Sequence, residues 1–107
     1  MVASAADIVV HVRLRQALAS AYGDNLARAM LFGSRARGDP RSDSDFDVAV
    51  FLHQPEGLWA ESGRLGAIAA DILDETGAVV NALPFPASAF DARTPLMHEL
   101  RRDGVDL

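Results

Sequence analysis

The sequence predicts an α/β (α+β) fold, a small mixed three-stranded sheet packed with helices in the element order α-β-β-α-β-α. Three observations carry this prediction. Three segments have apolar residues at helical spacing, two short apolar runs end at glycine or proline, and one segment alternates apolar and acidic residues. The 107 residues are enough for one hydrophobic core. We therefore expect a single domain over residues 1–107.

The three helical segments differ in how clearly their ends are marked. Residues 4–22 form the first and end before Gly23, and the second begins near Leu58 and ends near Gly77. In the last helix Thr94 is the expected N-cap, Pro95 takes the first helical position, and the helix ends before Gly104. The positions expected to face the core are Val10, Leu14, Leu18 and Ala21 in the first helix, Leu58, Leu65, Ile68 and Ile72 in the second, and Leu96, Met97 and Leu100 in the last.

The strands are short and lie around a polar loop. Residues 27–32 form an apolar run that ends at glycine, and residues 78–83 form another that ends against Pro84 and Pro86. Residues 45–52 alternate, so that Phe46, Val48 and Val50 lie on one face and Asp45, Asp47 and Ala49 on the other. The loop between the first two strands, residues 33–44, is rich in glycine, serine, aspartate and arginine.

Composition excludes several classes of protein. The formal net charge of −5 argues against non-specific nucleic-acid binding. The absence of cysteine excludes disulfides, thiolate zinc sites and a thiol nucleophile. No apolar run approaches the roughly 20 residues of a membrane span, and residues 1–6 lack the pattern of a signal peptide. We therefore expect a cytoplasmic protein with no membrane partner.

All ten basic residues are arginine. Four of them flank the glycine loop: Arg28, Arg35, Arg37 and Arg41. Arginine favours bidentate contacts with phosphate. A biased genome composition explains the absence of lysine equally well, so both interpretations stay open.

Two motifs beside this loop point to phosphate chemistry. Gly33 at a strand end allows the backbone to approach a ligand, and consecutive N–H groups with the Ser34 hydroxyl can bind an anion. Asp45 and Asp47, about 7 Å apart along one face of a strand, repel each other unless a cation lies between them. Mg²⁺ binds through one or two carboxylates together with substrate phosphates. The combination predicts phosphoryl or nucleotidyl transfer, in which positioning and charge neutralisation supply most of the catalysis.

The same residues resemble the signature of the polymerase-β-type nucleotidyltransferase superfamily, which is Gly-Ser, a spacer, and Asp-x-Asp on a strand. The wording Leu-Phe-Gly-Ser-Arg-Ala-Arg-Gly over 31–38 is most similar to that of the minimal nucleotidyltransferases, which include MntA-like antitoxins of HEPN/MNT toxin–antitoxin pairs. The likeness is specific over 31–50 and looser elsewhere.

This resemblance implies roles for individual residues. Gly33 and Ser34 would hold the β- and γ-phosphates of ATP or another nucleoside triphosphate. Asp45 and Asp47 would ligate Mg²⁺, with Mn²⁺ as the alternative ion. Arg35 and Arg37 are candidates for phosphate contacts, or else they are solvated or pair with nearby acids. The partner would be a HEPN-domain toxin that receives AMP on a tyrosine. The protein could form a homo-oligomer or a hetero-oligomer with this partner.

One position departs from the family pattern. Active relatives carry a third carboxylate on the following strand, where this chain has Asn81. An amide can offer an oxygen to a metal but cannot act as a base. Asp106 in Val-Asp-Leu at the chain end and Asp43 in the loop are weaker candidates for the missing group. Asp71, Asp74 and Glu75 are expected to form a solvated helix face.

Four large side chains are not assigned to the site. His11 and His98 have no partner at ligand spacing, and His53 is expected to be a loop residue, although it could approach a bound nucleotide. Trp59 either covers the core or belongs to a partner surface.

Three functions remain in competition. The first is Mg²⁺-dependent transfer of a nucleotidyl group, AMP, to a partner protein. The second is a catalytically weakened antitoxin that neutralises its partner by binding alone, as Asn81 suggests. Transfer to RNA or a small molecule is the third, and the acidic charge and the lack of an acceptor domain argue against it.

Overall fold

The computed structural model describes residues 5–38 and 45–107. Its helices are α1 (Ala5–Tyr22), α2 (Leu58–Thr76) and α3 (Pro95–Asp103), with short 3-10 helices η1 (Gly23–Asn25) and η2 (Ala87–Asp91). Its strands are β1 (Leu26–Phe32), β2 (Phe46–Leu52), β3 (Val80–Pro86) and β4 (Val105–Asp106). None of the helices in these two ranges combines the length and the apolar character that crossing a membrane requires.

The sheet has the strand order β3-β2-β1-β4, so the predicted count of three strands was one too few. The sheet is mixed, as predicted, because β2 runs antiparallel to β1 and parallel to β3. The extra strand, β4, pairs antiparallel with β1 through Met30–Asp106 and Leu31–Val105. Two residues carry too little periodicity to be recognised as a strand, and their pairing is set by the position of α3 and not by local sequence.

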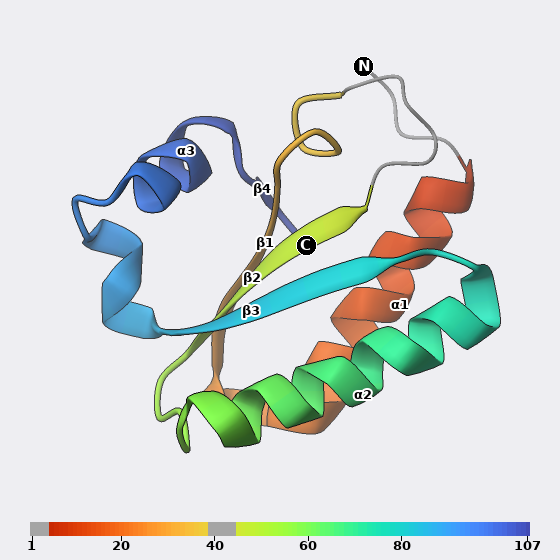
Figure 1. Ribbon diagram of the computed structural model, residues 1–107, viewed down its shortest axis with the longest axis horizontal. Helices are drawn as coiled ribbons and strands as arrows, with labels where there is room; N and C mark the ends of the chain where they lie inside the picture. Colours follow the sequence, from red (N-terminus) through yellow and green to blue (C-terminus); the bar gives the residue numbers. More distant parts are fainter. Residues whose placement is uncertain (1–4, 39–44) are drawn as a thin grey trace.

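Helices cover both faces of the sheet. Figure 1 shows α1 and α2 side by side along one face, with α3 and η2 on the other side. The alternation predicted for β2 is confirmed, because Phe46, Val48 and Val50 pack towards α1 and α2. Ala49 and Phe51 face the second cluster, which includes Met97 and Leu100 of α3. The central strand is therefore buried on both faces, and this leaves only its ends accessible.

The predicted helix faces are correct in α3 and partly wrong elsewhere. The Thr94 hydroxyl oxygen accepts a hydrogen bond from the Met97 N–H at 3.2 Å, which confirms the N-cap. In α1 the buried position of the last turn is Tyr22, and Ala21 is exposed. In α2 Leu58 is 66% exposed, whereas Glu61 is fully buried one turn later. The carboxylate of Glu61 is buried because its oxygens accept hydrogen bonds from the N–H of Glu56 and from Arg64.

The third strand continues through both prolines instead of ending before them. Pro84 and Pro86 pair with Val50 and Leu52 of β2. Proline is tolerated in a strand at the edge of a sheet, where its missing N–H faces away from the neighbour. β3 occupies such an edge.

Candidate active site

The predicted site residues meet where three strands share one edge. β2 and β3 are parallel and both begin at this edge, whereas β1 is antiparallel and ends there. The register places Phe32 opposite Asp47, and Asp47 opposite Asn81. Gly33, which follows β1, and Asp45, which precedes β2, lie at the same edge. The fold therefore brings together segments that are about 50 residues apart in the chain.

A carboxylate–amide cluster forms the centre of this site. The side-chain amide of Asn81 donates to Asp45 Oδ2 at 2.9 Å and to Asp47 Oδ1 at 3.3 Å. Asp45 and Asn81 are exposed and Asp47 is half-buried, so the cluster is open to a ligand. One neutral amide thus bridges two like charges and relieves part of their repulsion. Asn81, to which the family resemblance assigns the third-carboxylate position, thus contacts both aspartates.

Gly33 brings the end of β1 into contact with this cluster. Its φ of +77° lies in the left-handed region, which favours glycine. A Cβ built at this position would lie 2.7 Å from Asp47 Oδ2. The turn is closed by the N–H of Arg37, which donates to the Gly33 carbonyl at 3.2 Å. Any larger residue at position 33 would therefore displace the Asp47 carboxylate.

Arg35 connects the glycine turn to α1. Its guanidinium donates to the Asp7 carboxylate at 2.9 Å and lies 4.2 Å above the centre of the Phe46 ring. Only 12% of the Arg35 side chain is exposed. Asp7 is 28 positions away from Arg35, so no local sequence pattern could have revealed this pair. The ion pair and the stacking hold the start of the loop against the helical layer.

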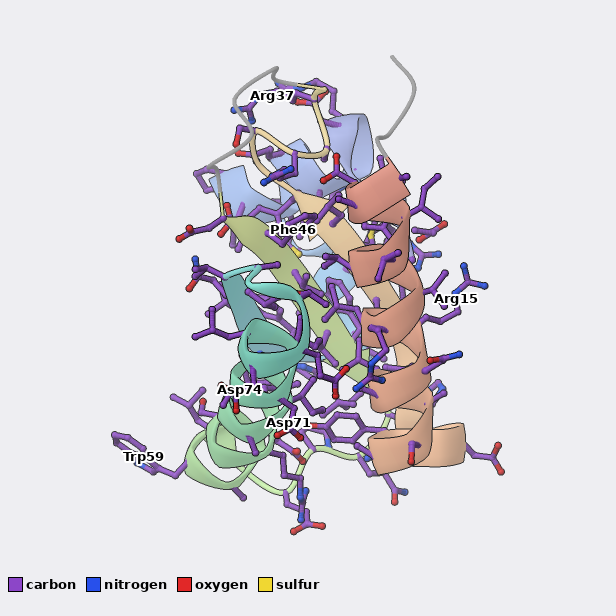
Figure 2. The ribbon with its side chains drawn as sticks, turned by 90° about the vertical axis from the view of Figure 1, so that its right-hand side faces the viewer. Arg15, Arg37, Phe46, Trp59, Asp71 and Asp74 are labelled. Carbon is purple, nitrogen blue, oxygen red and sulfur yellow. The ribbon has the colours of Figure 1, made fainter. Side chains whose placement is uncertain are left out.

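Arg37 lies on the other face of the sheet. It forms an ion pair of 3.7 Å with Glu99 of α3, and its side chain is half-exposed. Figure 2 shows Arg37 at the end of the molecule where the glycine turn lies. Arg35 and Arg37 therefore each pair with an acidic side chain, which is one of the alternatives that the sequence left open, and Arg41 lies outside the described residues. Arg28 lies over the Phe90 ring instead.

Among the described residues, no other acidic side chain proposed from the sequence enters the cluster. Asp106 lies on β4, at the opposite edge of the sheet from β3. Asp71 and Asp74 are exposed on α2, as expected for a solvated face, although Glu75 beside them pairs with Arg13. Asp43 lies outside the described residues.

The large side chains set aside by the sequence lie away from the cluster. His11 on α1 makes a T-shaped contact with the Phe46 ring of β2, and burial lowers the pKa of this histidine. His53 and His98 are exposed, as expected. Trp59 is 89% exposed and does not cover the core. Figure 2 shows it projecting from the end of the molecule opposite Arg37.

The donor atoms of the cluster fit a hard divalent cation. In residues 5–38 and 45–107 no group of three or more His, Cys, Asp or Glu side chains is arranged for a metal. The cluster instead offers two carboxylates, and rotating the Asn81 carboxamide by half a turn would present its oxygen. Mg²⁺ is commonly held by one or two carboxylates together with phosphate oxygens and water. Asp45 and Asp47 would hold the ion, and Asn81 could add a neutral oxygen.

A mixed sheet that brings a Gly-Ser turn and an Asp-x-Asp strand to one open edge defines a nucleotidyltransferase-type site. The family of nucleotidyltransferases described as "Polymerase beta, Nucleotidyltransferase" matches residues 15–105, and the chain belongs to this family. No curated protein matches the chain in sequence.

Several solved structures share the fold. A toxin–antitoxin structure with AMP-PNP aligns with a TM-score of 0.65 at 20% identity, over 89% of this chain and 69% of that chain. A mutant of the toxin–antitoxin MntA–HpeT aligns with a TM-score of 0.65 at 17% identity, with the same coverage of both chains. A protein from Sulfolobus solfataricus assigned as a nucleotidyltransferase aligns with a TM-score of 0.60 at 20% identity, over 99% of this chain and 89% of that chain.

Proposed function

We propose that the chain is a Mg²⁺-dependent nucleotidyltransferase that transfers AMP from ATP to a hydroxyl group of a partner protein. The observation that carries this proposal is the contact of Asp45, Asp47 and Asn81 directly beside the Gly33 turn. Phosphoryl chemistry needs little more than such positioning and charge neutralisation. Another nucleoside triphosphate could replace ATP.

Each residue of the cluster has a distinct task in this proposal. The Gly33–Ser34 turn binds the β- and γ-phosphates through backbone N–H groups and the serine hydroxyl. Asp45 and Asp47 bind the metal that, when present, neutralises the triphosphate and polarises the α-phosphorus. Arg35, held by Asp7 and Phe46, fixes the position of the turn. Arg37 is half-exposed and is the better placed of the two arginines to reach a phosphate.

The transfer reaction requires a base for the proton of the acceptor hydroxyl, and Asn81 stands where relatives have a carboxylate. The acceptor oxygen bonds to the α-phosphorus, the bond from that phosphorus to the oxygen bridging it to the β-phosphate breaks, and pyrophosphate leaves. The acceptor proton must go to a base, and an amide cannot accept it. Within the cluster, only the carboxylates of Asp45 and Asp47 can accept this proton. We expect transfer to be slower than in relatives with three carboxylates.

The proposed acceptor is a HEPN-domain toxin, which makes the chain the antitoxin of a pair. Support comes from the likeness to toxin–antitoxin structures, one of them with AMP-PNP, and from the net charge of −5, which disfavours a nucleic-acid acceptor. The two proteins would meet in the cytoplasm and form a hetero-oligomer.

The test is incubation of the purified chain with labelled ATP, Mg²⁺ and its partner toxin. We expect label on the toxin, released by a phosphodiesterase and absent when EDTA is added. An intact, folded toxin that gains no label under these conditions would refute the proposed transfer.

A second candidate function has its own supporting observation. Asn81 donates its side-chain amide to both carboxylates and cannot itself act as a base. The chain could then neutralise the toxin by binding alone. Replacing both Asp45 and Asp47 with asparagine separates the two functions, because neutralisation would persist under binding alone and be lost if transfer is required.

A further inference from the structure

The outer edge of β3 carries unpaired backbone groups beside the candidate active site. The Phe46 N–H donates to the Val79 carbonyl at 2.9 Å. In a parallel pair of strands, this one bond fixes which backbone groups of β3 face β2. The N–H and C=O of Val80 and Ala82 therefore point away from β2. No hydrogen bond found within residues 5–38 and 45–107 uses these outward groups. Two donors and two acceptors therefore line a short open edge.

Both ends of this open segment are closed. The next outward positions are Pro84 and Pro86, which have no N–H to donate. Before the segment, the Ala78 N–H already donates to the Thr76 hydroxyl at 3.1 Å. Proline at a sheet edge blocks the addition of further strands. The open edge thus admits an extended chain only along Val80–Ala82.

The side chains beside the open edge lead directly to the site. Asn81 lies between Val80 and Ala82, and its side chain contacts Asp45 and Asp47. Val79 and Leu83 share this face by alternation and are 46% and 44% exposed. A strand added here would run about 4.8 Å from β3. The residue opposite Asn81 would then extend its side chain towards the carboxylates, and its neighbours two positions away would cover Val79 and Leu83.

We propose that the acceptor protein binds as an added strand on Val80–Ala82 and thereby delivers its hydroxyl side chain to the cluster. The inference rests on the proposed function for the transfer step but not for the binding step. It defines the acceptor segment as a hydroxyl-bearing residue with an apolar residue two positions away on each side. Main-chain hydrogen bonds supply the affinity, and the two apolar contacts set the register.

The critical variant is Ala82→Pro, matched by Ala82→Val. Proline removes the outward N–H without removing any bond between β3 and β2, as Pro84 already does on this strand. Asn81, which would precede the new proline, already has the extended backbone that this position requires. Valine adds a side chain of similar size but keeps the N–H, so it controls for packing against the helical layer.

The probe is the blocked peptide Lys-Thr-Leu-Thr-Tyr-Thr-Leu-Thr-Lys, whose symmetric pattern suits either strand direction. The control peptide Lys-Thr-Thr-Leu-Tyr-Leu-Thr-Thr-Lys has the same composition but moves the leucines to the other face. Amide hydrogen exchange of the full chain is followed by NMR without ATP. We expect exchange at Val80 and Ala82 to slow about tenfold with the first peptide only. Ala82→Pro should bind it about tenfold more weakly than Ala82→Val.

Several results would overturn the inference. They are no binding of the first peptide by the wild-type chain, equal affinities of the proline and valine variants, or protection confined to another element. Protection of Val80 and Ala82 in the free chain that grows with its concentration would assign the edge to a second copy instead. Because these measurements need no transfer, a chain that binds the peptide but labels no toxin would disprove the proposed function alone. Equal labelling of the toxin by Ala82→Pro and Ala82→Val would disprove strand addition at β3 and leave the proposed function standing.

Discussion

Gly33 allows the chain to turn at the end of β1 while its backbone touches the Asp47 carboxylate. Two properties of glycine are used at this one position, the positive φ and the absence of a Cβ. Gly77 at the end of α2 uses only the first. Its φ is +78°, almost the same, but a Cβ there would meet nothing within 4 Å. Comparing substitutions at Gly33 and Gly77 therefore separates the effect of backbone strain from the effect of crowding the Asp47 carboxylate.

Gly33→Ala should destabilise the fold by about 1–3 kcal/mol and abolish detectable binding of ATP in the presence of Mg²⁺. The new methyl group forces the Asp47 carboxylate aside. Gly77→Ala should show a similar loss of stability with unchanged ATP binding. Urea unfolding and calorimetric titration measure the two effects. Equal ATP affinity in both variants would show that the close approach at Gly33 has no functional role.

Asn81→Asp tests whether this position is that of the missing third carboxylate. The change replaces a bridging donor with a metal ligand and a base. We expect at least about a tenfold gain in Mg²⁺-dependent ATP binding or in transfer. Ser88→Asp adds the same charge at an exposed position of η2 and should change neither. An Asn81→Asp variant that matches wild type in both measurements would place the third position elsewhere.

At the scale of elements, the first turn of α2 is joined to the end of α1 by a buried polar group. Burial alone raises the pKa of Glu61, but the hydrogen bonds from the Glu56 N–H and Arg64 outweigh it, with a smaller effect of the nearby Tyr22 hydroxyl, and hold the pKa below the ordinary value of 4.5. Burial, together with the Glu61 carboxylate, raises the pKa of Tyr22 to about 12. The buried Tyr22 hydroxyl meets this carboxylate outside regular hydrogen-bond geometry. The pair therefore favours an ionised glutamate and a neutral tyrosine.

This arrangement predicts how stability depends on pH. Because folding depresses the pKa of Glu61, its contribution is complete above pH 4.5 and is lost as the pH falls through the lower, folded value. Glu61→Gln should cost about 2 kcal/mol at pH 7 and flatten the acid slope of the unfolding free energy. Asp74→Asn, an exposed change on the same helix, should cost less than about 0.5 kcal/mol. Equal acid slopes for wild type and Glu61→Gln, measured by urea unfolding, would contradict this account.

The sequence predicted the elements best where local signals define them. The Thr94 N-cap, the alternation of β2 and the C-terminal ends of α1 and α2 all follow from short patterns, and all are confirmed. The two-residue β4 and the continuation of β3 through Pro84 were missed. Both depend on which strand lies beside them, and this is a property of the sheet rather than of the segment.

The candidate site was predictable in location but not in its contacts. Family resemblance and spacing placed Gly33, Asp45, Asp47 and Asn81 near one another, and the register of the sheet brings them together. The buried Glu61 and the pairing of Arg35 with Asp7 had no counterpart in the sequence pattern. Long-range ion pairs depend on packing between α1, α2 and the loop, which no local window contains.

At the scale of the whole molecule, helices cover both faces of the sheet and leave the site accessible at the end of the sheet where β2 and β3 begin. The strand β2 is buried from Phe46 to Leu52 except at Asp47, so within this strand a polar side chain is accessible only near its beginning. In the proposed function the described residues hold the phosphates and the metal, and the acceptor group comes from a partner. A partner that supplies its own reacting group fits this architecture. We therefore infer that the site acts on a protein brought to the ends of the strands where Asp45 and Asn81 lie.

Mass spectrometry of the partner toxin after incubation with ATP and Mg²⁺ distinguishes transfer from binding alone. We expect one or more added adenylyl groups with the wild-type chain, more rapid addition with Asn81→Asp, and none when Asp45 and Asp47 are both asparagine. A folded toxin that binds the wild-type chain, is neutralised by it, and keeps its original mass would rule out transfer and leave binding alone as the mode of neutralisation.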